Sequence, residues 1–316
     1  MRIVFMGTPD FAVPSLEALL RSGDTVAGVV TQPDRPKGRG QTLAASPIKQ
    51  LAQREGLPIL QPLKMKDPEF LAALRSWQPD FIAVAAFGRI LPQVVLDMPP
   101  KGCINVHASL LPKFRGAGPI QWALITGERE TGITTMLMDA GMDTGAILLQ
   151  EKVPIDPDDT AGTLSDKLSA VGGPLLVETL QRLKAGTLVA QPQDHSQATM
   201  APLLQKEDGL IDWARSASDI ANRIRGLTPW PGAFTYAGDE RWTISRAYPE
   251  GPGDAAAEPG TIVSAAKDAI RVATGKGVLA IAELQPANSR RMSIQQYLAG
   301  HRVSPGSQLH SAAPQA

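Results

Sequence analysis

Three short apolar runs, separated by helical segments, constrain the fold of this 316-residue chain more than any other feature. They cover residues 2–6, 25–31 and 80–86, and most positions within them are apolar. Strands without a polar face are typical of a parallel sheet that is covered by helices on both sides. The first half of the chain is therefore expected to form an α/β layer structure.

The segments between and after these runs support the same interpretation. Helices are predicted over residues 15–22, 46–56, 67–77 and 119–127, with Ser46 as an N-cap and Pro47 at the first helical position. Further strands are predicted over residues 102–107, 133–138 and 147–153. Residues 163–184 form a long helical stretch that we expect to be interrupted at the Gly-Gly-Pro sequence of residues 172–174.

The pattern changes beyond residue 187. Residues 188–205 have no helical period and are predicted to be a linker between a domain of residues 1–187 and one of residues 206–316. After a predicted helix over residues 217–225, short strand candidates lie at residues 234–236, 241–245, 261–263, 270–273 and 278–283. Short strands at this spacing indicate a small β-barrel or sandwich.

Charge and cysteine content exclude several classes of protein. The 31 Lys and Arg balance the 31 Asp and Glu, so contact with a nucleic acid would depend on a local basic patch. The single cysteine, Cys103, excludes an internal disulfide and a cysteine-built zinc site, and the four histidines lack metal-ligand spacing. No signal peptide and no apolar run near the ~20 residues of a membrane span is present, so we expect a cytoplasmic protein without a metal.

The turn after the first strand candidate argues against a dinucleotide cofactor. It reads Gly7-Thr8-Pro9-Asp10, whereas a dinucleotide-binding turn has the pattern G-x-G-x-x-G. Pro9 removes a backbone amide that could bind a pyrophosphate, and the second glycine is absent. The sequence therefore disfavours an NAD-dependent oxidoreductase.

The strand over residues 102–107 carries two candidate catalytic side chains. Asn105 and His107 are two residues apart, so they share a face of the strand near its carboxyl end. Ligands of open α/β sheets bind at that edge. Asn105 could donate to a developing oxyanion, and His107 could exchange a proton near neutral pH. Alternatively, both side chains satisfy loop backbone inside the core.

Two loops are further candidates. Asp143 lies in the sequence Asp-Ala-Gly-Met-Asp-Thr-Gly of residues 139–145, and its carboxylate could orient or stabilise a histidine. The alternative is an ordinary Asp-Gly turn. The loop of residues 31–41 carries Arg35, Lys37 and Arg39 without an apolar anchor, so it could neutralise phosphates or simply be solvated.

Taken together, these segments resemble the 10-formyltetrahydrofolate-dependent formyltransferases over nearly the whole chain. The N-x-H, S-L-L-P and D-x-G-x-D-T-G motifs are shared by that wider family. The opening GTPDFA, the loop QPDRPKGRG and the later PWPGA resemble the members that formylate methionyl-tRNA.

The resemblance implies transfer of the formyl group of 10-formyltetrahydrofolate, as co-substrate, to the α-amino group of methionyl initiator tRNA. It implies a Rossmann-like, mostly parallel sheet followed by a small C-terminal β-barrel of the oligonucleotide-binding type that contacts tRNA. The family's catalytic residues correspond to Asn105, His107 and Asp143. Its folate-binding residues correspond to Ser109, Leu110, Leu111, Pro112, Phe87, Arg89, Ile90 and Leu91, and Arg35, Lys37 and Arg39 are expected to bind tRNA.

Other readings stay open on the sequence. A formyltransferase acting on a small amine would keep Asn105, His107 and Asp143 without needing the basic loop. A non-catalytic tRNA- or folate-binding protein would not need the complete set of three. We expect a monomer that binds no membrane.

Overall fold

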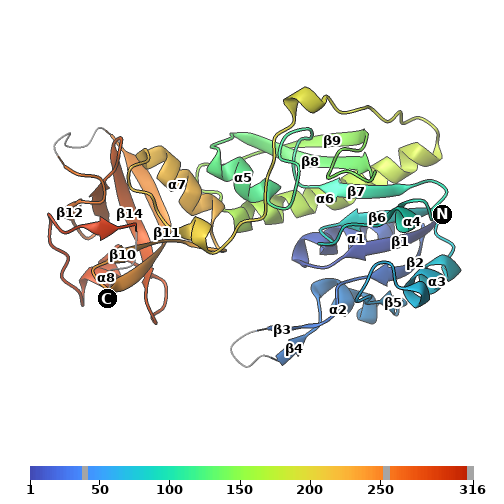
Figure 1. The fold of residues 1–316 in the computed structure, drawn as a ribbon, viewed down its shortest axis with the longest axis horizontal. Coiled ribbons are helices and arrows are strands. Elements are labelled where there is room, and N and C mark those ends of the chain that lie inside the picture. Colours follow the sequence, from blue (N-terminus) through green and yellow to red (C-terminus); the bar gives the residue numbers. More distant parts are fainter. Residues whose placement is uncertain (38–41, 252–256, 312–316) are drawn as a thin grey trace. The chain divides into compact units, whose positions relative to one another are not determined.

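The computed structural model describes residues 1–37, 42–251 and 257–311, without the side chains of Lys37 and Thr42 (Figure 1). Contacts divide the chain into two compact units. The first comprises Met1–Pro119, Glu130–Pro154 and Ser165–Pro202, and the second comprises Ile120–Arg129, Ile155–Leu164 and Leu203–Ala316. The second unit therefore includes two short segments from the first half of the chain.

The first unit is built on a seven-stranded sheet of order β5-β2-β1-β6-β7-β8-β9. Its strands are β1 (Arg2–Gly7), β2 (Thr25–Val30), β5 (Ile59–Leu60), β6 (Phe81–Ala85), β7 (Cys103–His107), β8 (Glu130–Leu137) and β9 (Ile147–Pro154). The five strands from β5 to β7 are parallel, and β8 and β9 are antiparallel. The mostly parallel α/β layer structure is as predicted, with the short β5 as an additional edge strand.

Helices lie on both sides of this sheet (Figure 1). They are α1 (Val13–Arg21), α2 (Pro47–Arg54), α3 (Pro68–Ser76), α4 (Gln93–Leu96) and the long α6 (Ala161–Lys184), which contributes residues to both units. Apolar side chains of α3 and α4 pack with those of β1 and β6 in one buried cluster. Two-sided burial explains why the strands are apolar at consecutive positions.

The expected interruption of the long helix at residues 172–174 was wrong, because α6 continues through Pro174. Gly172 and Gly173 allow the helix to pack closely against β7 and α1. A Cβ added at Gly173 would lie 2.6 Å from the Pro14 carbonyl oxygen, and one at Gly172 would lie 3.1 Å from a Val106 methyl group. This close packing stabilises the helix despite the backbone hydrogen bond that a proline cannot make.

A two-stranded hairpin extends from the body of the first unit (Figure 1). It pairs β3 (Arg35–Lys37) with β4 (Thr42–Ala44) and is called the basic hairpin below. Hydrogen bonds hold its base: Asp34 accepts from Lys49 Nζ at 2.6 Å and from Gln61 Nε2 at 2.8 Å. Both bonds hold the pKa of Asp34 below its usual value. The residue that precedes β3 is therefore held in place by hydrogen bonds to the body of the first unit.

The second unit is a curled antiparallel sheet of order β12-β13-β14-β11-β10-β16. Its strands are β10 (Ala233–Ala237), β11 (Glu240–Glu250), β12 (Ile262–Ala265), β13 (Ile270–Ala273), β14 (Val278–Pro286), β15 (Met292–Ser293) and β16 (Leu309–His310). A bridge between Thr261 and Gln308 joins the two ends of the sheet, which gives the barrel-like form expected.

Among the described residues, three α-helices belong wholly or mainly to the second unit: α5 (Pro119–Ile125), α7 (Ala217–Gly226) and α8 (Ile294–Leu298). Trp213 and Trp242 are buried in its apolar core, where Trp242 packs edge-on against Tyr297. These two indoles are therefore packing residues. The Trp230 side chain is 49% exposed.

Candidate active site

The carboxyl end of β7 places Asn105 and His107 side by side on one face of the sheet. In register, Asn105 is opposite Met136 and His107 is opposite Thr134 of β8. The alternate residues, Ile104 and Val106, are fully buried on the other face. The strand period thus presents both polar side chains at the switch from parallel to antiparallel pairing.

His107 is 5% exposed, and both of its ring nitrogens face polar groups. Nε2 lies 3.0 Å from the Phe114 carbonyl oxygen, and Nδ1 lies 3.6 Å from Asp143 Oδ2. A carbonyl oxygen can only accept, so this contact assigns a proton to Nε2. In the neutral ring, Nδ1 then carries the free lone pair and can take up a proton beside the carboxylate.

Asp143 is held in place through the same carboxylate oxygen that faces His107. Its Oδ2 accepts a hydrogen bond from the Gly116 amide at 2.8 Å. Gly116 has a φ of 116°, and an added Cβ would lie 2.8 Å from the Ala201 carbonyl oxygen. Asp143 itself has a φ of 52°, a left-handed conformation that aspartate tolerates better than most residues. The loop therefore keeps a strained backbone that aims the carboxylate at His107.

Asn105 differs from His107 and Asp143, because no described residue forms a hydrogen bond with its side-chain amide. The side chain is only partly buried. An amide without a protein partner is available to donate to a bound substrate.

A cavity of about 150 Å³ adjoins Asp143, whereas Asn105 and His107 are not among the residues that line it. It is lined by Arg89, Ile90, Leu91, Met136, Met138 and the loop residues Asp139, Ala140, Gly141, Met142 and Asp143. Of the predicted folate-binding residues, Arg89, Ile90 and Leu91 thus lie beside the predicted catalytic Asp143. The Arg89 guanidinium is anchored by the Leu63 carbonyl oxygen at 2.8 Å.

Phe87 is not among the residues that line this cavity. Its side chain is 2% exposed within an apolar cluster of the first unit. Its carbonyl oxygen accepts from Gln32 Nε2 at 2.9 Å and from Thr8 Oγ1 at 3.2 Å. The residue therefore supports the loop that carries Arg89 and Ile90.

The segment Ser109, Leu110, Leu111 and Pro112 directly follows β7 and is braced by β8 and β9. Thr134 Oγ1 donates to the Ser109 carbonyl oxygen at 2.6 Å and accepts from the Leu111 amide at 3.1 Å. Gln150 Nε2 donates to the Leu111 carbonyl oxygen at 2.9 Å. The Ser109 hydroxyl donates to the Lys113 carbonyl oxygen, so it is used within the loop.

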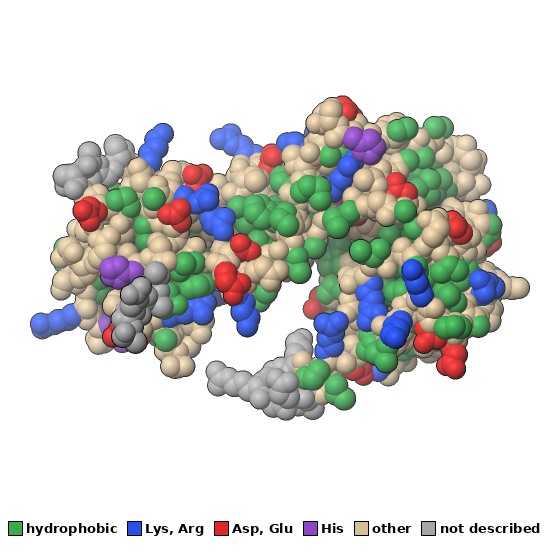
Figure 2. Space-filling model, in the orientation of Figure 1, with side chains coloured by type: hydrophobic (Ala, Val, Ile, Leu, Met, Phe, Trp, Pro, Cys, Tyr) green, Lys and Arg blue, Asp and Glu red, His purple; other side chains and the backbone are tan. Residues whose placement is uncertain are grey.

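The basic hairpin carries two of the three predicted tRNA-binding residues. Arg35 is exposed, and its Nη2 donates to Gln32 Oε1 at 2.8 Å. Lys37 ends β3, and Arg39 lies outside the described residues. On the face drawn in Figure 2, Lys and Arg lie among Asp and Glu on both units, in keeping with the balanced net charge.

Several basic side chains of the second unit are engaged within it. Arg223 donates to the Asp208 carbonyl oxygen and Arg225 to that of Asp159. Arg271 is paired with Glu250 at 2.9 Å and Asp268 at 2.7 Å. Their positive charge is thus partly satisfied by the protein itself.

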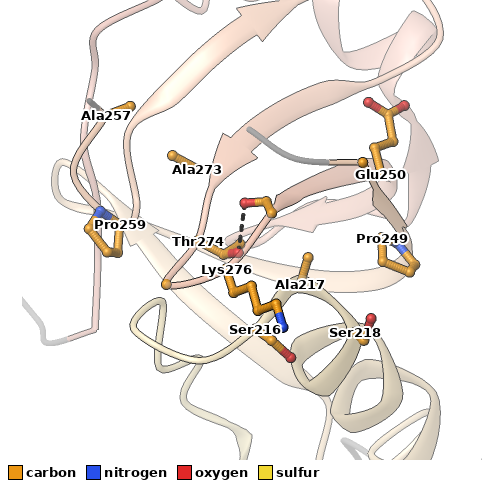
Figure 3. Close-up of a pocket in the computed structure, with 13 residues that line it drawn as sticks. Ser216, Ala217, Ser218, Pro249, Glu250, Ala257, Pro259, Ala273, Thr274 and Lys276 are labelled. Carbon is orange, nitrogen blue, oxygen red and sulfur yellow. Dashed lines mark hydrogen bonds between the residues drawn. The ribbon is translucent and has the colours of Figure 1, made fainter. Parts of the chain in front are cut away.

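A second, larger cavity of about 720 Å³ lies in the second unit, beside the start of α7 (Figure 3). Its described lining includes Glu250 and Lys276 as charged residues but no histidine or cysteine. Glu250 is already paired with Arg271. The cavity therefore offers no counterpart to the imidazole and carboxylate of the first unit.

The described part of the chain holds one buried cysteine and no cluster of potential metal ligands. Burial, with a smaller contribution from Asp97, raises the pKa of Cys103 to about 12, so its thiol is a poor nucleophile. No cluster of three His, Cys, Asp or Glu side chains is arranged to hold a metal ion among the described residues. No described helix is long and apolar enough to span a membrane.

Sequence reasoning missed several groups that build the site. The Phe114 carbonyl and the Gly116 amide are backbone groups, which carry no residue-specific signal. Gln193 lies within the predicted linker, yet it is 6% exposed and donates to the loop that carries Asp143. A glutamine between turn residues has no periodicity that would have marked it.

Fold and site together define an α/β protein in which a strand-end Asn and His lie close to a loop Asp that lines a small cavity. Comparison with known proteins gives the family. Residues 1–180 match the family described as "Formyl transferase" and residues 203–302 match "Formyl transferase, C-terminal domain". The chain belongs to the formyl transferase family.

Relatives with assigned names agree with this membership. The chain is 52% identical to "Methionyl-tRNA formyltransferase" of Desulfotalea psychrophila, covering 96% of this chain and 94% of the relative. It is 50% identical to the protein of the same name from Geotalea uraniireducens, covering 98% of both chains. Among solved structures, the sugar 3N-formyl transferase WlaRD, crystallised in the presence of dTDP and 5-N-formyl-THF, has the same fold. That match has a TM-score of 0.68 at 19% identity over 92% of this chain and 99% of the other.

Proposed function

We infer that this chain transfers the formyl group of 10-formyltetrahydrofolate to the α-amino group of methionyl initiator tRNA. The observation that carries this conclusion is the placement of His107 and Asp143 3.6 Å apart, with Asn105 on the same strand face as His107. Relatives named for this activity are about half identical over nearly the whole chain. The product is the N-formylmethionyl-tRNA of translation initiation.

Deprotonation of the amine is a small part of the barrier. A free α-amino group has a pKa of about 7.7–8.0, so roughly a tenth or more is neutral at pH 7. Attack of that nitrogen on the formyl carbon forms the new C–N bond and places negative charge on the formyl oxygen. We propose that Asn105 donates to this oxyanion, a contribution typically worth about 3–4 kcal/mol.

Collapse of the intermediate requires a proton to move between two nitrogens. The new amine loses a proton, the bond from carbon to the folate nitrogen breaks, and that nitrogen gains a proton. We propose that His107 carries the proton on Nδ1, since Nε2 is engaged with Phe114. Asp143 would stabilise the imidazolium, and such proton transfer typically contributes about 10²–10⁴-fold.

We propose that Arg35 and Lys37 of the basic hairpin, together with Arg39, bind tRNA phosphates. Changing all three to alanine should raise KM for charged tRNA. It should also reduce the slope of log KM against log salt by about 2–3, because each lost phosphate contact removes roughly 0.7–0.9.

The matched control for this variant removes three cations elsewhere on the first unit. Arg21, Lys152 and Arg182 are each paired with a nearby carboxylate, so their replacement by alanine changes the net charge equally. We expect the control to keep the wild-type slope. Equal slopes for the hairpin variant and the wild type would show that the hairpin does not contact phosphates.

The experiment that tests the function compares two acceptors. Purified protein is incubated with 10-formyltetrahydrofolate and either charged initiator methionyl-tRNA or free methionine, in the presence of a chelator. We expect N-formyl product from the tRNA, and none at comparable efficiency from the free amino acid. Equal formylation of both would favour an enzyme for small amines, and loss of activity in the chelator would contradict the proposed absence of a metal.

We further propose the division of labour along the chain. Residues 1–187 would form the catalytic domain and residues 206–316 a tRNA-contacting domain; of the predicted linker of residues 188–205, the part up to Pro202 packs with the first unit. The pterin and adjoining groups of the folate would lie along Ser109–Pro112 and residues 87–91. An acceptor that is a charged tRNA is consistent with a cytoplasmic enzyme, and we propose that it acts as a monomer.

A further inference from the structure

Gln193 is a buried side chain whose amide is fully used within the first unit. Its Nε2 donates to the Asp143 carbonyl oxygen at 2.8 Å and to the Gly145 carbonyl oxygen at 2.7 Å. These two carbonyls lie on either side of Thr144, at the end of the loop that aims Asp143 at His107. A single amide group therefore holds the backbone of the carboxylate-bearing loop.

The other end of the same side chain is tied to Arg115. Gln193 Oε1 accepts from Arg115 Nη2 at 2.6 Å and from Nε at 3.1 Å. Arg115 is 6% exposed, and its Nη2 also contacts His195 Nδ1 at 3.0 Å. Both hydrogens and both acceptor positions of the Gln193 amide are thus occupied.

These hydrogen bonds form a connected network around Asp143. Arg115 is followed directly by Gly116, whose amide donates to Asp143 Oδ2. The carboxylate is therefore held through Gly116, and the backbone of the same residue is held through Gln193. Arg115 connects the two supports, so moving Gln193 would disturb both.

The segment after Gln193 supports the other partner of His107. Thr199 Oγ1 accepts from the Phe114 amide at 2.9 Å, and the Thr199 carbonyl oxygen accepts from the Arg115 amide at 2.8 Å. Phe114 provides the carbonyl that receives the His107 Nε2 proton. Residues 193–199 therefore form hydrogen bonds with both residues that orient the His107 imidazole, Asp143 and Phe114.

We propose that Gln193 is a positioning residue for formyl transfer, acting through Asp143, and that residues 193–199 are part of the catalytic apparatus. This inference rests on the proposed function. Gln193 does not line the cavity, so substrate binding should depend on it little. Its effect should fall on kcat, because a displacement of about 1 Å at a reacting group can cost about 100-fold.

The primary test is Gln193→Glu, which keeps the size and the acceptors for Arg115 but loses both donors to the loop. We expect kcat to fall about 10- to 100-fold, with KM for the folate and for charged tRNA within about twofold of wild type. Gln191→Ala is the matched control, since Gln191 is exposed on the same segment and pairs with Ile147 through backbone atoms. It should retain wild-type kcat.

A double-mutant cycle separates positioning from a general structural role. In an Asp143→Ala background, adding Gln193→Glu should lower kcat no further, because the group through which Gln193 acts is gone. If the fold-reductions in kcat of the two single variants multiply in the double variant, the proposal is overturned. Gln193→Ala repeats the comparison, with thermal unfolding confirming that each variant is folded at the assay temperature.

The two proposals fail in different ways. If the wild-type protein forms no N-formylmethionyl-tRNA, the proposed function is wrong. If the wild type is active and folded Gln193→Glu matches Gln191→Ala in kcat, only the positioning role is wrong.

Discussion

Replacing His107 with alanine is expected to lower kcat about 10²- to 10⁴-fold, the usual contribution of a positioned acid–base group. Its Nδ1 is the free nitrogen beside Asp143, so the variant loses the group that is proposed to carry the proton. Folate binding should survive, because the His107 ring does not line the cavity. Its polar contacts are with Phe114 and Asp143, and of these two only Asp143 lines the cavity. Single-turnover formylation measures the chemical step directly.

The control for this variant is His310→Ala. His310 is exposed at the end of β16 in the second unit, and its contact with Thr235 is through its carbonyl oxygen. We expect this protein to keep wild-type kcat. A His107→Ala enzyme with near-normal turnover would remove the imidazole from the catalytic role and require another route for the proton.

Replacing Asn105 with alanine is expected to lower kcat about 10²- to 10³-fold, the typical cost of losing one oxyanion donor. The free energy of unfolding should change little, because no described residue bonds to the Asn105 amide. Asn105→Asp should be at least as damaging, since a carboxylate beside a developing oxyanion repels it. The measurement is kcat and KM of the wild type, Asn105→Ala and Asn105→Asp, with a thermal unfolding curve for each protein.

The Asn105 variants should still bind the folate with nearly wild-type affinity, as measured by titration calorimetry. A donor that acts only on developing charge affects kcat, whereas uniform binding affects KM. A large rise in folate KM at unchanged kcat would assign Asn105 to ground-state binding instead. Normal values for both constants would exclude it from the site.

Much of the site could be predicted from local pattern. Asn105 and His107 share a face because a strand alternates its side chains, and the carboxyl edge follows from parallel pairing. The expectation that Arg89, Ile90 and Leu91 bind the folate came from the family resemblance and not from local pattern; the structure places them beside Asp143 in the lining of the cavity.

The supports of the site could not be predicted in the same way. Asp143 faces His107 because a glycine amide 27 residues earlier holds its carboxylate, and Gln193 holds its backbone from 50 residues later. Contacts at such separations leave no periodicity. The unbroken α6 was missed for a related reason, since close packing against α1 and β7 outweighs the local preference of Gly-Gly-Pro.

The amino-acid sequence by itself determined the layers of the first unit, the strand-rich second unit, and which imidazole, amide and carboxylate could do the chemistry. These follow from hydrophobic period and side-chain type, which are local properties of the chain. Only the tertiary structure decided that residues 193–199 hold the Asp143 loop and the Phe114 backbone, and that the His107 contact with Phe114 assigns a proton to Nε2. Those depend on backbone groups brought together from distant segments, and such groups are the same in every residue.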